Sequence, residues 1–288
     1  MTNCAVVGVG RIGGEVAYLA ATLGIVDELI LYDHLPEFLK AQVLDLQHTG
    51  LPVTISTNPR DIHDTDLCVF AAGVPRTQSV KTRADLLAVN LTATKECAAL
   101  LDGFGGVLVT VTNPMDVNNF ILHRMAGIPG ERCIGFGGQL DSARFSLALE
   151  RRGIVGNAWV LGEHGEYQIP LFSSLSQPVS TDVREEILTE LRGASMEVIR
   201  GKSGTVFGPA YHIARLIRAI LQDRQEVMAC STVLDGEYGI NGCSLGVPVR
   251  VGRSGILAIE QWDLDPWEKE RMERAGQFVQ GLCRTVNL

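Results

Sequence analysis

The stretch that decides the fold lies near the N-terminus and reads Cys4-Ala5-Val6-Val7-Gly8-Val9-Gly10-Arg11-Ile12-Gly13-Gly14. Its first four residues are apolar and include two β-branched side chains, a pattern typical of a short buried strand. The residues that follow, up to Leu23, predict a helix with Val16 and Ala20 on one side. A strand, a glycine-rich turn and a helix in this order predict the first unit of a dinucleotide-binding fold.

The glycines and the next acidic residue suit a dinucleotide. Gly8 permits a tight turn, Gly10 lets the backbone approach a pyrophosphate, and Gly13 lets the helix pack closely on the strand. The helix N-terminus then faces the phosphate charge. A second predicted strand, Glu28–Tyr32, leads directly into Asp33, where a carboxylate hydrogen-bonds a ribose 2′-hydroxyl and repels a 2′-phosphate. The sequence therefore favours NAD over NADP, and the alternative is a glycine-rich turn with an acidic residue there by chance.

Strands and helices alternate along the first half of the chain. Helices are predicted over residues 36–46 and 86–101, and further strands over residues 53–56, 67–71, 107–111 and 132–135. This alternation is typical of an α/β protein with a Rossmann-type, doubly wound parallel sheet. Ligands bind beyond the carboxyl ends of the strands in such sheets, so we expect Gly73 and Asn113 to border a cleft.

Composition limits the class of protein. The chain has 288 residues, of which 46% are hydrophobic and 20% are charged, as in soluble globular proteins of one or two domains. The net charge of −8 argues against a nucleic-acid partner. The longest stretch without Asp, Glu, Lys or Arg, residues 167–181, contains polar residues, so no membrane-spanning segment is expected.

The N-terminal residues and the cysteines lead us to expect a cytoplasmic protein. No basic segment precedes the first strand, so we expect no signal peptide. The seven cysteines are scattered, without a CxxC pair or a cluster at metal-ligand spacing. They are expected to be reduced and mostly buried, and no metal site is predicted.

The second half of the chain contains a segment that suggests proton transfer. Gly162-Glu163-His164-Gly165-Glu166 follows an apolar run, which places the histidine on a turn at the end of a predicted strand. Asp141 and Arg144 precede it and lie one helical turn apart. A histidine that moves a proton, an aspartate that orients it and an arginine that binds an anion are consistent with a catalytic site. The alternative is a solvated histidine near an ordinary salt-bridged helix.

The remaining elements predict a mixed α+β half. We expect a strand over residues 154–161, antiparallel strands over residues 233–240 and 245–251, and helices over residues 142–152, 182–199 and 265–286. The segment over residues 202–210 is expected to lead into a further helix that ends at about residue 221. We therefore predict an NAD-binding domain over residues 1–140 and a substrate-binding and catalytic domain over residues 141–288.

Seven motifs resemble those of the NAD-dependent lactate and malate dehydrogenases, in the order seen in that family. They are GVGRIGG, Asp33, AAGVPR…TRADLL…N, VTNPMDV, GGQLDSARF, GEHGE and LDGEYGI…GVP. The resemblance extends from Cys4 to about Gly255. It implies a Rossmann-type domain followed by a catalytic domain, with NAD as the cofactor.

The resemblance also implies roles for individual residues. His164 matches the family's proton donor and acceptor, and Asp141 matches its carboxylate partner. Arg144 matches the arginine that binds the substrate carboxylate, Arg83 the lid arginine that polarises the reacting carbonyl, and Asn113 the asparagine near substrate and nicotinamide. The positions that match the cofactor cleft are Gly8, Gly10, Arg11, Ile12, Gly13, Asp33, Gly73, Asn90, Val111 and Asn113.

The loop over residues 74–83 bears on the choice of substrate. From composition alone a solvated surface loop is favoured over a lid that brings cations to an anion. Within the family, malate enzymes usually carry an arginine early in this loop, where lactate enzymes carry glutamine, and Arg76 fits the malate pattern. However, Arg76 and Arg83 are seven residues apart instead of the usual six, and the usual Pro-Gly pair is absent. We interpret this as an inserted residue after Arg76; a displaced arginine is the alternative.

The resemblance thus implies reversible NAD-dependent oxidation of (S)-malate to oxaloacetate. L-lactate or another 2-hydroxy acid is the alternative substrate, and a non-catalytic NAD-binding module is the alternative from a different class. NAD-dependent glycoside hydrolysis on a related fold is disfavoured, because that chemistry typically uses a metal site built from Cys and His and the sequence shows no such cluster. The helix over residues 36–46 resembles the family's intersubunit helix, which implies a homodimer or a homotetramer.

Overall fold

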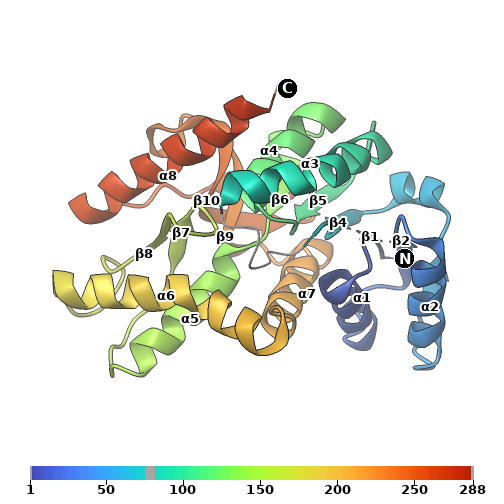
Figure 1. Ribbon diagram of the computed structural model, residues 1–288, viewed down its shortest axis with the longest axis horizontal. Helices are drawn as coiled ribbons and strands as arrows, with labels where there is room; N and C mark the ends of the chain where they lie inside the picture. The colour runs from blue at the N-terminus through green and yellow to red at the C-terminus, as the bar shows by residue number, and fades with distance from the viewer. Residues whose placement is uncertain (1, 75–81, 287–288) are drawn as a thin grey trace.

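The computed structural model describes residues 2–74 and 82–286 (Figure 1). In this part of the chain, eleven strands form one sheet in the order β3-β2-β1-β4-β5-β6-β9-β10-β7-β8, with β11 paired to β10. Helices lie on both sides of the sheet, with α3, α4 and α8 on one side and α1, α5, α6 and α7 on the other (Figure 1). The arrangement confirms the α/β prediction.

The first six strands are all parallel and have the order β3-β2-β1-β4-β5-β6, which confirms the Rossmann-type half. The elements of this half are β1 (Asn3–Val7), α1 (Arg11–Thr22), β2 (Glu28–Tyr32), α2 (Pro36–Gln47), β3 (Thr54–Ser56), η1 (Pro59–Asp64), β4 (Leu67–Phe70), α3 (Arg83–Leu100), β5 (Val107–Thr110), α4 (Met115–Ala126), η2 (Gly130–Arg132) and β6 (Cys133–Gly135). The six strands lie within about one residue of the predicted ranges, because short β-branched runs bounded by turn residues are strong local signals.

Alternate residues of β1 explain why both faces of the sheet are covered. Cys4 and Val6 pack in the same core cluster as Val16 and Ala20 of α1. Ala5 and Val7 belong to a second cluster that includes residues from α3 and α4. Because successive side chains of a strand point to opposite faces, an apolar run such as β1 requires helices on both sides.

The second half mixes antiparallel strands with helices. Its elements are α5 (Gly138–Glu150), β7 (Val160–Gly162), β8 (Gln168–Pro170), α6 (Thr181–Lys202), α7 (Phe207–Leu221), β9 (Glu226–Asp235), η3 (Glu237–Gly239), β10 (Asn241–Gly252), β11 (Gly255–Ile259) and α8 (Pro266–Thr285). An antiparallel bridge between Gly135 of β6 and Ser231 of β9 joins this half to the parallel sheet. The predicted domain boundary between residues 140 and 141 falls inside α5. It stays a prediction.

Several predicted elements differ from those observed. The strand predicted over residues 154–161 is reduced to β7, and β9 begins at Glu226, not at residue 233. The middle of β9 is buried on both faces, so it has none of the alternation that identifies a half-exposed strand. The sequence pattern also does not predict α4, because that helix is buried almost all round, including Asn118 and Asn119.

In the described ranges, no helix combines the length and the apolar character needed to cross a lipid bilayer.

Candidate active site

The glycine-rich turn after β1 is packed so closely that two of its glycines are obligatory. A Cβ on Gly8, whose φ is +89°, would lie 2.3 Å from the Cα of Ala72. A Cβ on Gly13 would lie 1.9 Å from the carbonyl oxygen of Gly8. By contrast, apart from Gly10 and its two chain neighbours, no atom of the described residues lies within 4 Å of a Cβ placed on Gly10. The turn therefore presents an open backbone surface at Gly10, beside the N-terminus of α1, which fits a phosphate group.

Asp33 links this turn to the end of β2. Its Oδ2 accepts a hydrogen bond from the backbone N–H of Val9 at 3.1 Å, and its Oδ1 accepts one from Leu35 at 3.1 Å. The side chain is 10% exposed; Oδ1 also lies 3.3 Å from Nδ1 of His34, whereas Oδ2 has a second lone pair. The carboxylate is thus held at the edge of the turn with acceptor capacity for a further donor.

Two residues predicted to border the cofactor have other contacts here. The Nη1 of Arg11 donates hydrogen bonds to the carbonyl oxygens of Ser203 at 3.0 Å and Lys202 at 3.4 Å, at the C-terminus of α6. Ile12 packs against the main core cluster. Arg11 therefore connects the glycine-rich turn to the second half of the chain, and its role toward a cofactor stays a prediction.

Asn90 holds the ends of β4 and β5 together. Its Oδ1 accepts a hydrogen bond from the backbone N–H of Val74 at 2.7 Å, and its Nδ2 donates to the carbonyl oxygen of Asn113 at 2.7 Å. The residue is 1% exposed, and Gly73 passes so close that a Cβ there would lie 2.8 Å from Oδ1. Val111 is partly buried against the main core cluster. The structure thus places Asn90 as a buried support of the predicted cleft residues.

The structure brings His164, Asp141 and Arg144 together, as the sequence predicts. The Nδ1 of His164 lies 2.6 Å from Oδ2 of Asp141, and the Nη1 of Arg144 donates to Oδ1 of the same carboxylate at 2.9 Å. Asp141 is almost completely buried, whereas the other two side chains are each 17% exposed. Burial pushes the pKa of the Asp141 carboxyl upward, but the charges and hydrogen bonds of His164 and Arg144 outweigh it and lower that pKa below its ordinary value.

The ring orientation of His164 follows from these contacts. Since Nδ1 faces Asp141, Nε2 is the ring nitrogen left without a hydrogen-bond partner among the described residues. Gly137 makes room for the ring, because a Cβ there would lie 2.5 Å from its Cγ. The ring is therefore oriented by its surroundings, with one nitrogen ready to exchange a proton with a ligand.

Asp116 supports the backbone of His164 and is a residue that the sequence analysis misses. Its Oδ2 accepts a hydrogen bond from the backbone N–H of His164 at 2.9 Å, and the residue is 2% exposed. Burial, with a further contribution from the negative charge of Glu163, raises the pKa of Asp116 to about 6. The residue lies in the motif VTNPMDV, but only folding brings it to a turn 48 residues away.

Arg83 approaches the same turn from the start of α3. Its Nη2 donates to the carbonyl oxygen of His164, and its Nη1 donates to Oδ1 of Asn113 at 3.3 Å. Its Nε lies 3.0 Å from Oε1 of Glu163, another residue that the sequence analysis does not assign to the site. Thr82 and Asp85 form a capping box that begins α3 directly before Arg83. The fold thus places Arg83 and Asn113 beside His164. Arg76 lies outside the described residues.

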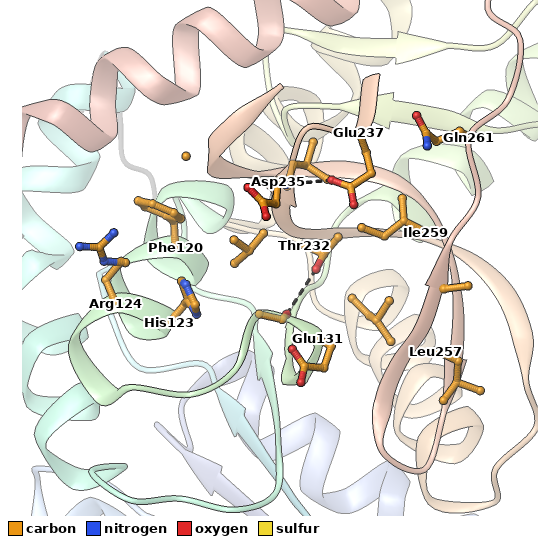
Figure 2. Close-up of a pocket in the computed structure, with 16 residues that line it drawn as sticks. Phe120, His123, Arg124, Glu131, Thr232, Asp235, Glu237, Leu257, Ile259 and Gln261 are labelled. Carbon is orange, nitrogen blue, oxygen red and sulfur yellow. Dashed lines mark hydrogen bonds between the residues drawn. The ribbon is translucent and has the colours of Figure 1, made fainter. Parts of the chain in front are cut away.

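A cavity of about 650 Å³ lies elsewhere in the molecule (Figure 2). Figure 2 shows Phe120, His123 and Arg124 of α4 on one side and Thr232 of β9 and Ile259 of β11 on the other. None of the residues around His164 lines it. We therefore locate the candidate active site by the chemistry of its side chains and not by the size of a cavity.

Known families match both halves of the chain. Residues 2–135 match the family model described as the NAD binding domain of lactate/malate dehydrogenase. Residues 138–281 match the model described as the alpha/beta C-terminal domain of lactate/malate dehydrogenase. The first match ends at residue 135, and the second begins at the first residue of α5.

Individual proteins are similar over nearly their whole length. The malate dehydrogenase of Natronomonas pharaonis is 36% identical, over 96% of this chain and 97% of that protein. The L-lactate dehydrogenase of Halalkalibacterium halodurans is 32% identical, over 97% of this chain and 96% of that protein. Among solved structures, the malate dehydrogenase of Archaeoglobus fulgidus in complex with NADH is similar with a TM-score of 0.91 and 29% identity, covering 100% of both chains.

Proposed function

This chain belongs to the lactate/malate dehydrogenase family, and we propose that it catalyses the reversible NAD-dependent oxidation of (S)-malate to oxaloacetate. The observation that carries the proposal is the buried Asp141 carboxylate, which binds both His164 and Arg144. A proton acceptor and an anion-binding group are thereby held side by side. Relatives at 36% and 37% identity that are named malate dehydrogenase support this choice of substrate.

The residues of the first half fit NAD. The glycine-rich turn leaves open space at Gly10, and Asp33 keeps acceptor capacity at its edge. Gly73 and Asn113 lie at the carboxyl ends of β4 and β5, where ligands bind in such sheets. When bound, the nicotinamide supplies the acceptor for the hydride that leaves the C2 carbon of malate.

His164 handles the proton in this proposal. Its Nε2 accepts the proton of the 2-hydroxyl group in the oxidation direction and returns it in the reduction direction. Asp141 fixes the ring tautomer through Nδ1 and stabilises the protonated ring with its negative charge. The backbone bond to Asp116 holds the turn that carries the ring.

The two arginines act on the substrate. Arg144 uses Nη1 toward Asp141, and the rest of its planar fork is suited to the C1 carboxylate. Arg83 stabilises the negative charge that develops on the carbonyl oxygen. Asn113, which accepts a bond from Arg83, keeps its amide donors for the substrate.

The second candidate substrate is lactate or another 2-hydroxy acid, which the 32% identical L-lactate dehydrogenase favours. A distal carboxylate of malate needs a cation, and we propose Arg76 for that role. The test compares NADH oxidation with oxaloacetate and with pyruvate, for the wild type and for Arg76→Gln. We expect oxaloacetate to be preferred by orders of magnitude and Arg76→Gln to lose the preference. A wild type that prefers pyruvate would contradict malate as the substrate, but it would still be a 2-hydroxy-acid dehydrogenase.

We also propose a homodimer or homotetramer formed through α2. That helix and the residue before it expose Leu35, Phe38 and Leu44, with exposed fractions of 52%, 43% and 51%. Leu39 is the only buried residue of α2, so most of the helix is open to a second copy. Light scattering of the wild type and of Phe38→Asp tests this; a wild-type monomer would contradict it.

We also propose a cytoplasmic location. The seven cysteines support it, because all of them are buried and free of disulfides.

A further inference from the structure

The turn that carries His164 also forms a seat for Arg83. The carboxylate of Glu163 is fixed at both oxygens: Oε2 accepts a hydrogen bond from the backbone N–H of Tyr167 at 3.0 Å, and Oε1 lies 3.0 Å from Nε of Arg83. The Nε–H is not aimed at Oε1, so this contact is an ion pair without an aligned hydrogen bond. The Glu163 side chain is 4% exposed and that of Arg83 is 13% exposed, so water screens the pair little.

The rest of the guanidinium is held by the same turn and by the end of β5. Nη2 donates to the carbonyl oxygen of His164, and Nη1 donates to Oδ1 of Asn113. Gly165 is necessary for this approach, because a Cβ there would lie 1.9 Å from Nη2 of Arg83 and 2.3 Å from Oε1 of Glu163. Glu163, His164 and Gly165 therefore all accommodate the arginine. Glu163 does so through its carboxylate, His164 through its carbonyl oxygen and Gly165 through the absence of a side chain.

The charge of Glu163 has no purpose in the local turn. An amide oxygen would accept the hydrogen bond from Tyr167 equally well. The charge is also unfavourable toward Asp116, whose pKa it helps to raise. A buried carboxylate beside another acidic residue is costly unless a cation is paired with it, and Arg83 is that cation.

From these contacts we propose that Glu163 is a positioning residue for Arg83. It holds the guanidinium beside His164 before the substrate arrives, so that the positive charge is already aligned with the carbonyl oxygen that develops negative charge. Electrostatic groups that are preorganised in this way need no rearrangement during the reaction. The inference rests on the proposed function, because it assigns a purpose to Arg83 in that reaction.

The test is a double-mutant cycle on kcat for oxaloacetate reduction, with Glu163→Gln, Arg83→Gln and the double variant. Gln keeps the acceptor for Tyr167 and removes only the charge. We expect Glu163→Gln to lower kcat by about 10- to 100-fold, as a small misplacement of a catalytic group does, with NADH affinity unchanged. In the Arg83→Gln background the same change is expected to lower kcat by less than about twofold, because the arginine that it positions is gone.

Two controls separate positioning from general damage. Glu190→Gln removes a glutamate that is also paired with arginines, Arg151 and Arg152, on the surface, and should leave kcat unchanged. Gly165→Ala keeps the Glu163 charge but places a methyl group between Arg83 and Oε1 of Glu163, so it should lower kcat even if Glu163→Gln does not fold.

Two results would overturn the inference. They are a Glu163→Gln enzyme with wild-type kcat, and a loss of equal size in both backgrounds of the cycle. If none of the 2-oxo acids supports NADH oxidation by the wild type, the proposed function itself fails. That result differs from both of the results that would overturn the inference.

Discussion

The Nδ1 atom of His164 lies 2.6 Å from Oδ2 of Asp141, although the two residues are 23 positions apart in the chain. The aspartate lies in the first turn of α5, and the histidine follows β7, so their distance is set by how this helix packs against this strand. The pair determines which ring nitrogen is available to a substrate, and the first prediction follows from it.

Replacing His164 by asparagine should abolish most turnover without affecting cofactor binding. Asparagine cannot accept and return a proton, so we expect kcat to fall by about 10²- to 10⁴-fold. NADH affinity, measured by fluorescence titration, should stay at the wild-type value because the glycine-rich turn is untouched. His63→Asn, at an exposed position, is the matched control. Wild-type turnover in His164→Asn would contradict the role of this ring.

Asp116→Asn should change how stability depends on pH. The pKa of Asp116 rises from 3.8 to about 6 on folding, so the folded state keeps a proton that the unfolded state releases between about pH 4 and pH 6. The wild type therefore loses stability as the pH rises through this window, by on the order of 3 kcal/mol. Asparagine carries no such charge, and its oxygen can still accept the N–H of His164.

Urea unfolding at pH 4.5 and pH 7.5 measures this effect. The free energy of unfolding of Asp116→Asn, relative to the wild type, should be higher at pH 7.5 than at pH 4.5. Asp64→Asn, at an exposed position, controls for the loss of one acidic residue. If the difference in free energy of unfolding between Asp116→Asn and the wild type is the same at both pH values, the pKa of Asp116 does not change on folding.

Alanine at two glycines of the same turn should impair two different properties, stability at Gly13 and NADH binding at Gly10. A Cβ at Gly13 would overlap the carbonyl oxygen of Gly8, so Gly13→Ala should lower the melting temperature strongly. A Cβ at Gly10 has no contact within 4 Å beyond its chain neighbours among the described residues, and the backbone there is extended with a φ of −68°, so Gly10→Ala should fold normally. The methyl group would instead obstruct a phosphate, so NADH binding should weaken. Tight NADH binding by Gly10→Ala would argue against this location for the pyrophosphate.

Asn90→Ala should affect stability more than it affects chemistry. The variant leaves the backbone N–H of Val74 and the carbonyl oxygen of Asn113 without their buried partner. We expect the free energy of unfolding to fall by about 1–3 kcal/mol, measured by denaturant titration. Asn58→Ala, which removes an exposed cap of η1, is the comparison and should lose less. An equal or smaller loss at Asn90 would contradict its assignment as a buried support.

The sequence alone determined the parallel half of the fold and the chemistry of the site. Short β-branched strands, the glycine-rich turn and Asp33 are local signals, because strand burial and tight turns constrain the residues within them directly. The same holds for the turn that carries His164 and for the helical turn that separates Asp141 from Arg144. These segments were sufficient to predict the six strands β1 to β6, their parallel, doubly wound arrangement and the group that surrounds Asp141. The order of the strands in the sheet came from the structure.

Only the tertiary structure decided how distant segments meet. α4 has no amphipathic pattern because neighbours surround it, and β9 has no alternation because it is buried on both faces. The pairing of Glu163 with Arg83, and of Asp116 with the backbone of His164, joins residues many positions apart. Composition and spacing carry no signal for such pairs, because the packing of α3, α4 and β7 around one turn brings them into contact. The physical reason is that a side chain's partners are set by the fold's topology, whereas its local conformation is set by its neighbours in sequence.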